Sequence, residues 1–129
     1  MNDIVVRTPL ISYQNSQIFL KPENLQPFGS YKIRGVSSAV QTASPDVLKH
    51  GLFAASAGNM AQSVAYIAWQ RSIQCRIFVP DTAPDIKKNA IKNLGAELIE
   101  LPFAQVWEMV RTPPKNFEGL FIHPGVNTG

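Results

Sequence analysis

The chain has 129 residues, of which 45% are hydrophobic and 16% are charged, and its net charge is +3. This composition is typical of one globular domain rather than of a disordered chain. The lysines are scattered instead of forming a basic arm, which argues against a nucleic-acid partner. No apolar run approaches the ~20 residues of a membrane span, so we expect no membrane partner either.

One cysteine and the N-terminal residues bear on the cellular compartment. Cys75 has no second cysteine to pair with, and we expect it to be a small core residue in a predicted strand. Residues 1–3 lack the basic-then-apolar order of a signal peptide. We therefore expect a cytoplasmic protein.

The first 45 residues contain short elements without a regular alternation. Residues 10–13 and 17–21 have the composition of two short strands, and a helix is predicted from Tyr31 to about Thr42, entered through Ser30. We assign residues 1–45 to a separate N-terminal segment.

Strands and helices alternate regularly from Leu52 onward. The predicted strands occupy residues 52–56, 75–80, 97–101 and 119–123. Helices are predicted at 60–70, at 84–94 and from Phe103 to Pro113. Such alternation builds parallel strands with right-handed crossovers. The sequence therefore predicts an α/β fold, with a four-stranded parallel sheet and flanking helices, for the domain at 46–129.

The helix at 84–94 has the clearest boundaries. Pro84 suits its first position, Asp85 favours its N-terminal end, and Gly95 fits the residue beyond its C-terminus. Its expected core face consists of Ile86, Ala90, Ile91 and Leu94. Its expected solvent face consists of Lys87, Lys88, Asn89 and Lys92.

Two motifs carry candidate chemistry. The first places a lysine amine at the start of a helix, in the run Ser30-Tyr31-Lys32-Ile33-Arg34-Gly35. The second follows a predicted strand and opens a helix, so that backbone N–H groups are presented to an anion, in the run Ser56-Ala57-Gly58-Asn59-Met60-Ala61-Gln62. Each motif also has a purely structural interpretation, because Lys32 can be a solvated surface lysine and Asn59 an N-cap after a tight glycine turn.

Together the motifs resemble the pyridoxal-phosphate enzymes of the serine/threonine dehydratase type, which have the tryptophan-synthase-β-like fold (fold type II). The family's lysine motif is Ser-Phe-Lys-Ile/Leu-Arg-Gly, from which the run around Lys32 differs only by Tyr31. The resemblance covers residues 8–124, with a shortened third helix-and-loop region. Residues 1–45 resemble the start of the family's large domain, and residues 46–124 resemble its small domain.

The resemblance implies roles for individual residues. Lys32 would hold pyridoxal phosphate as an imine and then act as general base at Cα of the amino acid. Asn59 would also approach the cofactor. The implied substrate-binding residues are Ser56, Ala57, Gly58, Asn59 and Gln62. Met60 stands where the dehydratases commonly have a histidine, which weakens the choice of a particular substrate. The lone His50 and His123 indicate no metal site.

The implied function is dehydration and deamination of L-threonine or L-serine, with this chain as the N-terminal or truncated portion of the enzyme. In the family the cofactor phosphate is held by a glycine-rich loop that follows the small domain, so we expect weak cofactor binding and no activity from this chain alone. We expect a homo-oligomer or a complementing chain as its partner, beside the small amino-acid substrate. The alternative is a catalytically incomplete small α/β domain that acts as a binding or interaction module.

Overall fold

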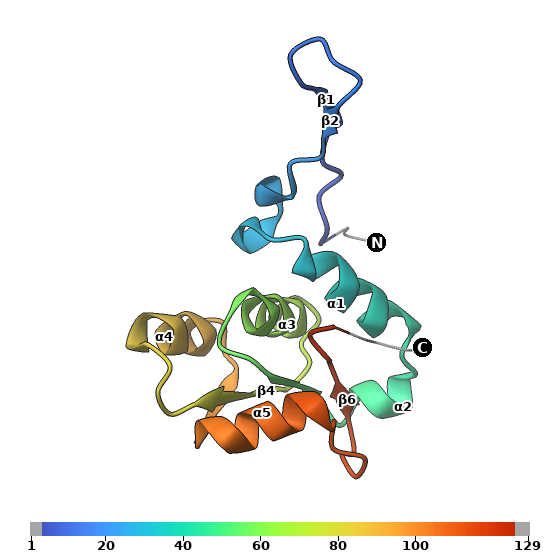
Figure 1. Cartoon of the computed structure of the whole chain (residues 1–129). Coiled ribbons are helices and arrows are strands. Elements are labelled where there is room, and N and C mark those ends of the chain that lie inside the picture. Colours follow the sequence, from blue (N-terminus) through green and yellow to red (C-terminus); the bar gives the residue numbers. More distant parts are fainter. Residues whose placement is uncertain (1–3, 126–129) are drawn as a thin grey trace.

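The computed structural model describes residues 4–125 and contains a sheet with helices on both faces, from which an N-terminal hairpin stands away (Figure 1). The strands of the sheet are β3 (Leu52–Ala55), β4 (Cys75–Pro80), β5 (Glu97–Leu101) and β6 (Leu120–Phe121). Their order is β5-β4-β3-β6, and all neighbouring pairs are parallel. The predicted α/β fold and its four-stranded parallel sheet are confirmed, although β6 is shorter than the expected 119–123.

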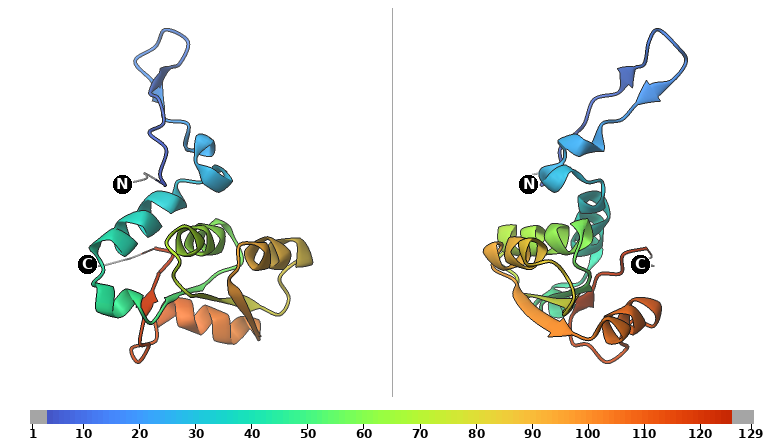
Figure 2. Two further views of the ribbon diagram at one scale, coloured as in Figure 1. Left: turned by 180° about the vertical axis from the view of Figure 1, so that it is seen from behind. Right: turned by 60° about the vertical axis from the view of Figure 1, so that its left-hand side comes forward.

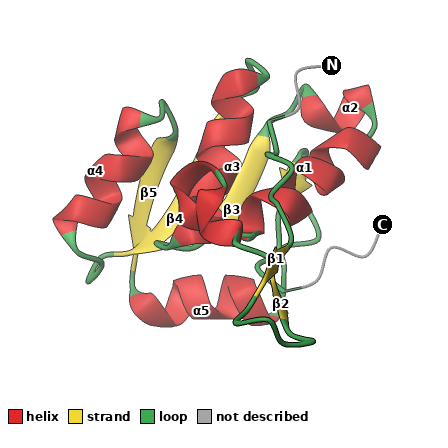
Figure 3. Ribbon diagram, turned by 90° about the horizontal axis from the view of Figure 1, so that it is seen from above, coloured by secondary structure: helices red, strands yellow, loops and turns green. Residues whose placement is uncertain are grey.

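The helices form two layers. On one face lie α1 (Lys32–Thr42), α3 (Asn59–Gln70) and α4 (Asp85–Asn93), and α5 (Phe103–Arg111) covers the other face (Figure 1). Seen from above, α4, α3 and α1 follow one another across the sheet (Figure 3). The short α2 (Pro45–Leu48) leads from α1 into β3. Both faces of a parallel sheet must be covered because its strands carry apolar side chains on both sides.

The core consists of two hydrophobic clusters, one on each face of the sheet. The larger cluster joins the sheet to α3 and also takes up Ile33, Val36 and Val40 of α1. The smaller cluster packs Phe53 and Phe78 against α5. Because α1 shares the core of the sheet domain, it is held firmly against α3, while the domain boundary at residue 45 stays a prediction.

Cys75 is buried at the start of β4, as expected of a small core residue. Its burial raises the pKa of the thiol to about 12, because a buried thiolate would lose its hydration. The thiol therefore stays protonated at neutral pH.

The face of α4 that meets the core differs from the prediction. Ile91 is buried as expected, but Ile86 is 79% exposed and Lys88 only 8% exposed. Lys88 lies three residues before Ile91 and shares its face, whereas Ile86, five residues before Ile91, is turned well away. The Lys88 amine is satisfied because it donates to Glu100 Oε2 at 2.8 Å and to the Asp81 carbonyl at 2.9 Å. The expectation that Lys88 faces water is therefore wrong.

The N-terminal segment begins with an antiparallel hairpin that projects from the body in both views of Figure 2. Its strands are β1 (Ile11–Ser12) and β2 (Phe19–Leu20), within the ranges predicted for two short strands. Two 3-10 turns, η1 (Glu23–Leu25) and η2 (Pro27–Gly29), connect the hairpin to α1. No helix within residues 4–125 is long and apolar enough to cross a lipid bilayer.

Candidate functional site

Lys32 is the first residue of α1, and both its backbone N–H and its side-chain amine donate hydrogen bonds. Its backbone N–H donates to Ser30 Oγ at 3.3 Å, which explains why the helix is entered through a serine. Its amine donates to the Pro124 carbonyl at 2.7 Å and lies 5.2 Å from the centroid of the Tyr31 ring. The side chain is half-buried. The amine is thus held at a defined place between the N-terminal segment and the end of the sheet domain.

A cavity of about 590 Å³ opens beside this amine. It is lined by Lys32, Tyr31 and Ser38 from the N-terminal segment, by Met60 from α3 and by Pro124 from the chain beyond β6. Its volume lies within the roughly 300–1,000 Å³ of sites that hold small molecules. The cavity therefore offers a primary amine to a ligand of cofactor size.

The second motif forms the turn between β3 and α3. Ser56 Oγ accepts the Gly58 N–H at 3.1 Å, and the Gln62 N–H donates to the Gly58 carbonyl at 3.2 Å. The N–H groups of Asn59, Met60 and Ala61 donate to no other residue within 4–125, as in the first turn of any helix. They and the positive end of the helix dipole can receive a small anion such as a carboxylate.

The fold brings the two motifs to the same edge of the sheet. In parallel strands the carboxyl ends meet at one edge, so the turn after β3 and the segment after β6 emerge together. α1 packs on α3 and carries Lys32 to this edge. Met60 lines the cavity together with Lys32, whereas the five predicted substrate residues, Ser56, Ala57, Gly58, Asn59 and Gln62, do not line it. Their role and that of Lys32 stay predictions.

The segment that presents the Pro124 carbonyl is itself fixed by His123. Its Nδ1 accepts the Gly125 N–H at 3.0 Å, so the ring proton is on Nε2, which donates to the Val110 carbonyl at 2.7 Å. The histidine therefore links α5 to the chain that closes over Lys32. Sequence reasoning missed this contact, because Lys32 and Pro124 are 92 residues apart and no local pattern connects them.

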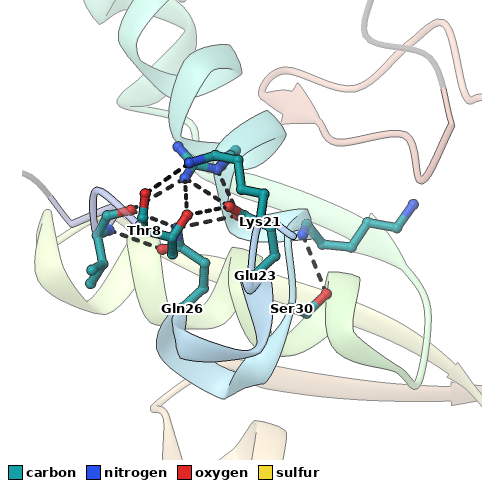
Figure 4. A network of polar contacts seen from close by, with 8 residues as sticks. Thr8, Lys21, Glu23, Gln26 and Ser30 are labelled. Atoms are coloured by element: carbon teal, nitrogen blue, oxygen red, sulfur yellow. Dashed lines mark hydrogen bonds and ion pairs between the residues drawn. The ribbon is translucent and has the colours of Figure 1, made fainter. Parts of the chain in front are cut away.

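A polar network at the base of the hairpin joins η1 to α1 (Figure 4). Glu23 is its centre: Arg34 Nε donates to one carboxylate oxygen at 2.7 Å and Arg34 Nη2 to the other at 2.9 Å. The Thr8 hydroxyl donates to Glu23 Oε1 at 2.7 Å. Such a bidentate pair fixes orientation as well as distance. Arg34, two residues from Lys32, is therefore committed to Glu23.

Gln26 and Lys21 close the network around the chain's N-terminal stretch. The Gln26 side chain accepts the Val6 N–H at 2.9 Å and donates to the Val6 carbonyl at 2.6 Å, so it pairs with the backbone as a neighbouring strand would. Lys21 Nζ donates to the Thr8 carbonyl at 2.9 Å. Gln26 is buried, so these bonds satisfy polar groups that have lost water. Sequence reasoning found none of these contacts.

The network predicts a specific acid sensitivity. The hydrogen bond from Arg34, followed by that from Thr8, lowers the pKa of Glu23 from 4.5 to about 2. A depressed pKa gives stability that is present above pH 4.5 and is lost as the pH falls from 4.5 to 2. Glu23→Gln is therefore expected to destabilise the protein at pH 7, and the difference from wild type should shrink over that window in urea unfolding curves.

Glu118→Gln is the matched control, because it removes a carboxylate that is largely exposed. It should leave the acid dependence between pH 4.5 and 2 as in the wild type. Equal loss of acid dependence in both variants would contradict the assignment to Glu23.

Within residues 4–125 no group of three or more histidine, cysteine, aspartate or glutamate side chains could hold a metal ion. The pair His50 Nδ1–Glu118 Oε2, at 3.7 Å, is a long surface contact.

Comparison with known proteins shows which proteins this chain is similar to. The catabolic L-threonine dehydratase TdcB of Staphylococcus aureus (strain USA300) is 42% identical over 100 residues, which are 72% of this chain and 29% of that protein. The serine racemase of Dictyostelium discoideum superposes with a TM-score of 0.80 at 27% identity, over 95% of this chain and 43% of that one. The processed form of threonine deaminase isoform 2 from Solanum lycopersicum gives a TM-score of 0.82 at 26% identity, over 95% and 36%.

The match covers only part of the relatives, since this chain spans less than a third of the length of the dehydratase. The two structural matches nevertheless cover 95% of this chain, and they confirm the resemblance to fold type II over the N-terminal part. The sequence profile described as pyridoxal-phosphate dependent enzyme matches residues 1–128, and the chain belongs to that family.

Proposed function

We propose that this chain is the lysine-bearing N-terminal part of an enzyme that uses pyridoxal phosphate to eliminate water from L-threonine or L-serine, after which hydrolysis by water releases ammonia and leaves a 2-oxo acid. One observation carries the proposal: the side chain of Lys32, at the start of α1, lines a cavity that is also lined by Met60 in the first turn of α3. The identity with an L-threonine dehydratase supports the choice of substrate class.

The residues at the cavity fit one end of the cofactor. A primary amine condenses with an aldehyde, and Lys32 supplies that amine beside a space large enough for the pyridine ring. The phosphate end carries close to two negative charges and needs cationic or N–H partners. Among residues 4–125, the cavity lining contains one other cationic side chain, that of Arg34. Glu23 neutralises its charge. We therefore expect cofactor binding through Lys32 with a weakly held phosphate.

Each group at the site then has a definite task. When bound, pyridoxal phosphate withdraws electrons from Cα of the amino acid. Lys32, once released from the Pro124 carbonyl, moves the proton at Cα through its amine. The N–H groups at the start of α3 bind the substrate carboxylate, and with Ser56 they hold the Cα–H bond in a fixed orientation. The hydrogen bonds of His123 hold the Pro124 carbonyl where it accepts from the amine.

Covalent trapping tests the proposal without requiring turnover. Incubation with pyridoxal phosphate, reduction with borohydride and peptide mapping should place the label mainly on Lys32, because its amine faces the cavity while the other lysines gain no binding site for the ring. Lys32→Arg should remove this label. The readout is the mass and position of the modified peptide.

Lys87→Arg is the matched control, because Lys87 is an exposed lysine on α4. The control should keep the full label on Lys32. A label spread evenly over the surface lysines, unchanged by Lys32→Arg, would contradict a special role for this residue.

A second candidate function is a binding or interaction module that keeps the fold without the reaction. The pairing of Arg34 with Glu23 favours it, since the cavity lining that the structure describes then offers the phosphate no free guanidinium. We further propose a homo-oligomer or a complementing chain as partner, and a cytoplasmic location consistent with one unpaired cysteine.

A further inference from the structure

The peptide unit between Pro124 and Gly125 connects Lys32 to His123. Its C=O group accepts from the Lys32 amine at 2.7 Å, and its N–H group donates to His123 Nδ1 at 3.0 Å. The unit is trans, so these two groups point in opposite directions within one rigid plane. A rotation of this plane that takes the N–H away from His123 therefore also takes the carbonyl away from Lys32.

The imidazole ring of His123 is fixed on its other side by α5. Its Nε2 donates to the Val110 carbonyl at 2.7 Å, near the C-terminal end of that helix. Nδ1 can accept the Gly125 N–H because a neutral imidazole with its proton on Nε2 has one donor and one acceptor nitrogen. The observed arrangement thus requires His123 to be neutral.

Protonation of His123 replaces the acceptor with a second donor. Both ring nitrogens of a histidine cation carry a proton, so the Nδ1–H group would face the N–H of Gly125. Nε2 is a donor in both forms and keeps its bond to Val110. The ring therefore stays in place while the Gly125 N–H turns away. Since the Pro124 carbonyl belongs to the same peptide unit, it leaves the Lys32 amine.

The charged groups on the cavity side of the ring also favour this release. Tyr31, Lys32 and Arg34 line the cavity together with His123. Arg34 is paired with Glu23, so its charge is compensated. A cationic His123 therefore adds its charge beside that of the Lys32 amine, and like charges repel.

The other elements near the ring contribute little net charge. The last turn of α5 contains Glu108 and Arg111 beside Val110, and their charges are opposite. Glu108 also accepts the Thr112 hydroxyl at 3.1 Å. α3 contributes the uncharged Met60 to the cavity. The charge that changes at this place is thus that of the imidazole itself.

We propose that His123 is a positioning residue for Lys32: when neutral it holds the amine on the Pro124 carbonyl, and when protonated it releases the amine into the cavity. The inference rests on the proposed function, in which Lys32 is the amine that takes the cofactor, but it requires no bound cofactor. Histidine is the side chain whose charge changes over about pH 5 to 8. This range lies above pH 4.5, below which the stabilising contribution of Glu23 is lost, so the two pH effects are separable.

Trace acetylation of the 129-residue chain with isotopically labelled acetic anhydride tests the proposal. Mass spectrometry of the peptides gives the ratio of the label on Lys32 to that on Lys87, an exposed lysine of α4. This ratio removes the general fall in amine reactivity that all lysines show as the pH is lowered. In the wild type it should rise by about tenfold as the pH falls through the range in which histidine titrates, because one charge-assisted hydrogen bond is lost.

Two substitutions separate the roles of the two ring nitrogens. His123→Asn keeps an acceptor at the place of Nδ1 but cannot be protonated, so the ratio should stay low at every pH. His123→Gln keeps a donor toward the Val110 carbonyl but no acceptor for the Gly125 N–H, so the ratio should be high at every pH. His50→Gln is the matched control, because His50 precedes β3 at the opposite end of the parallel strands, and it should keep the wild-type pH profile.

A ratio that does not change with pH in the wild type would overturn the proposal, as would a wild-type pH profile in His123→Asn. A low ratio at every pH in a folded His123→Gln would also overturn it. Circular dichroism should show the same folded content in all variants. If pyridoxal phosphate failed to label Lys32 while the pH profile of acetylation was intact, the proposed function alone would be contradicted.

Discussion

The 129-residue chain alone is expected to release ammonia from L-threonine or L-serine no faster than free pyridoxal phosphate does under the same conditions. The reason is the phosphate end of the cofactor, for which the cavity provides no free guanidinium within residues 4–125. Each missing charge-assisted hydrogen bond is worth about 1.5–3 kcal/mol. Since about 1.4 kcal/mol corresponds to a tenfold change, several missing bonds remove orders of magnitude in affinity.

The contact between Lys32 and Pro124 is also expected to lower the rate of ammonia release. The Lys32 amine donates to a carbonyl at 2.7 Å and must leave that acceptor before its nitrogen can attack an aldehyde. The carbonyl is held in place by the two hydrogen bonds of His123. Both features slow the loading of the lysine.

A coupled assay for the 2-oxo acid, at saturating pyridoxal phosphate, measures the expected result. Wild type and Lys32→Ala should give the same low rate, equal to that of the cofactor in buffer. Robust deamination that disappears in Lys32→Ala would show that the chain is catalytically complete. The labelling experiment is independent of this outcome, because a lysine can be trapped by borohydride without any turnover.

The sheet domain could be predicted because its signals are local. Short apolar runs, intervening helical patterns and turn residues such as Gly95 identify each element without reference to the others. The exposed and buried faces of α4 could not be predicted as reliably. Lys88 reaches Glu100 on β5 and the carbonyl of Asp81, and only the packing of the helix on the sheet shows that the amine finds both acceptors.

The candidate site likewise combines features that local sequence predicts with features that depend on packing. The motif around Lys32 is contiguous, and the sequence alone placed the lysine at the start of a helix. The Glu23–Arg34 pair spans 11 residues, and the contact of Lys32 with Pro124 spans 92. Such contacts depend on where α1 meets the edge of the sheet, which is a tertiary property. A sequence pattern can therefore identify the candidate lysine but not the groups that restrain it.

The largest expected loss of stability from a single methyl group is that of Gly119→Ala. Gly119 precedes β6, and a Cβ at this position would meet the ring of Phe53 and lie 2.7 Å from the Gly51 carbonyl. That ring is already packed 4.7 Å, between centroids, from the ring of Phe117. Either Phe53 or the start of β6 must therefore shift, and overpacking of this kind costs about 1–3 kcal/mol.

Gly35→Ala adds the same methyl group at an exposed position of α1 where there is room, since a Cβ added there would meet no described atom within 4 Å beyond its chain neighbours and the backbone of its own helix. An alanine there should stabilise the helix by about 0.5–1 kcal/mol, because glycine loses more backbone entropy on folding. Urea unfolding of the two variants at equal m-values should thus give shifts of opposite sign. If Gly119→Ala were as stable as wild type, β6 would not pack on Phe53 as described. The strand that carries Pro124 to Lys32 would then lack the support on which the geometry of the site depends.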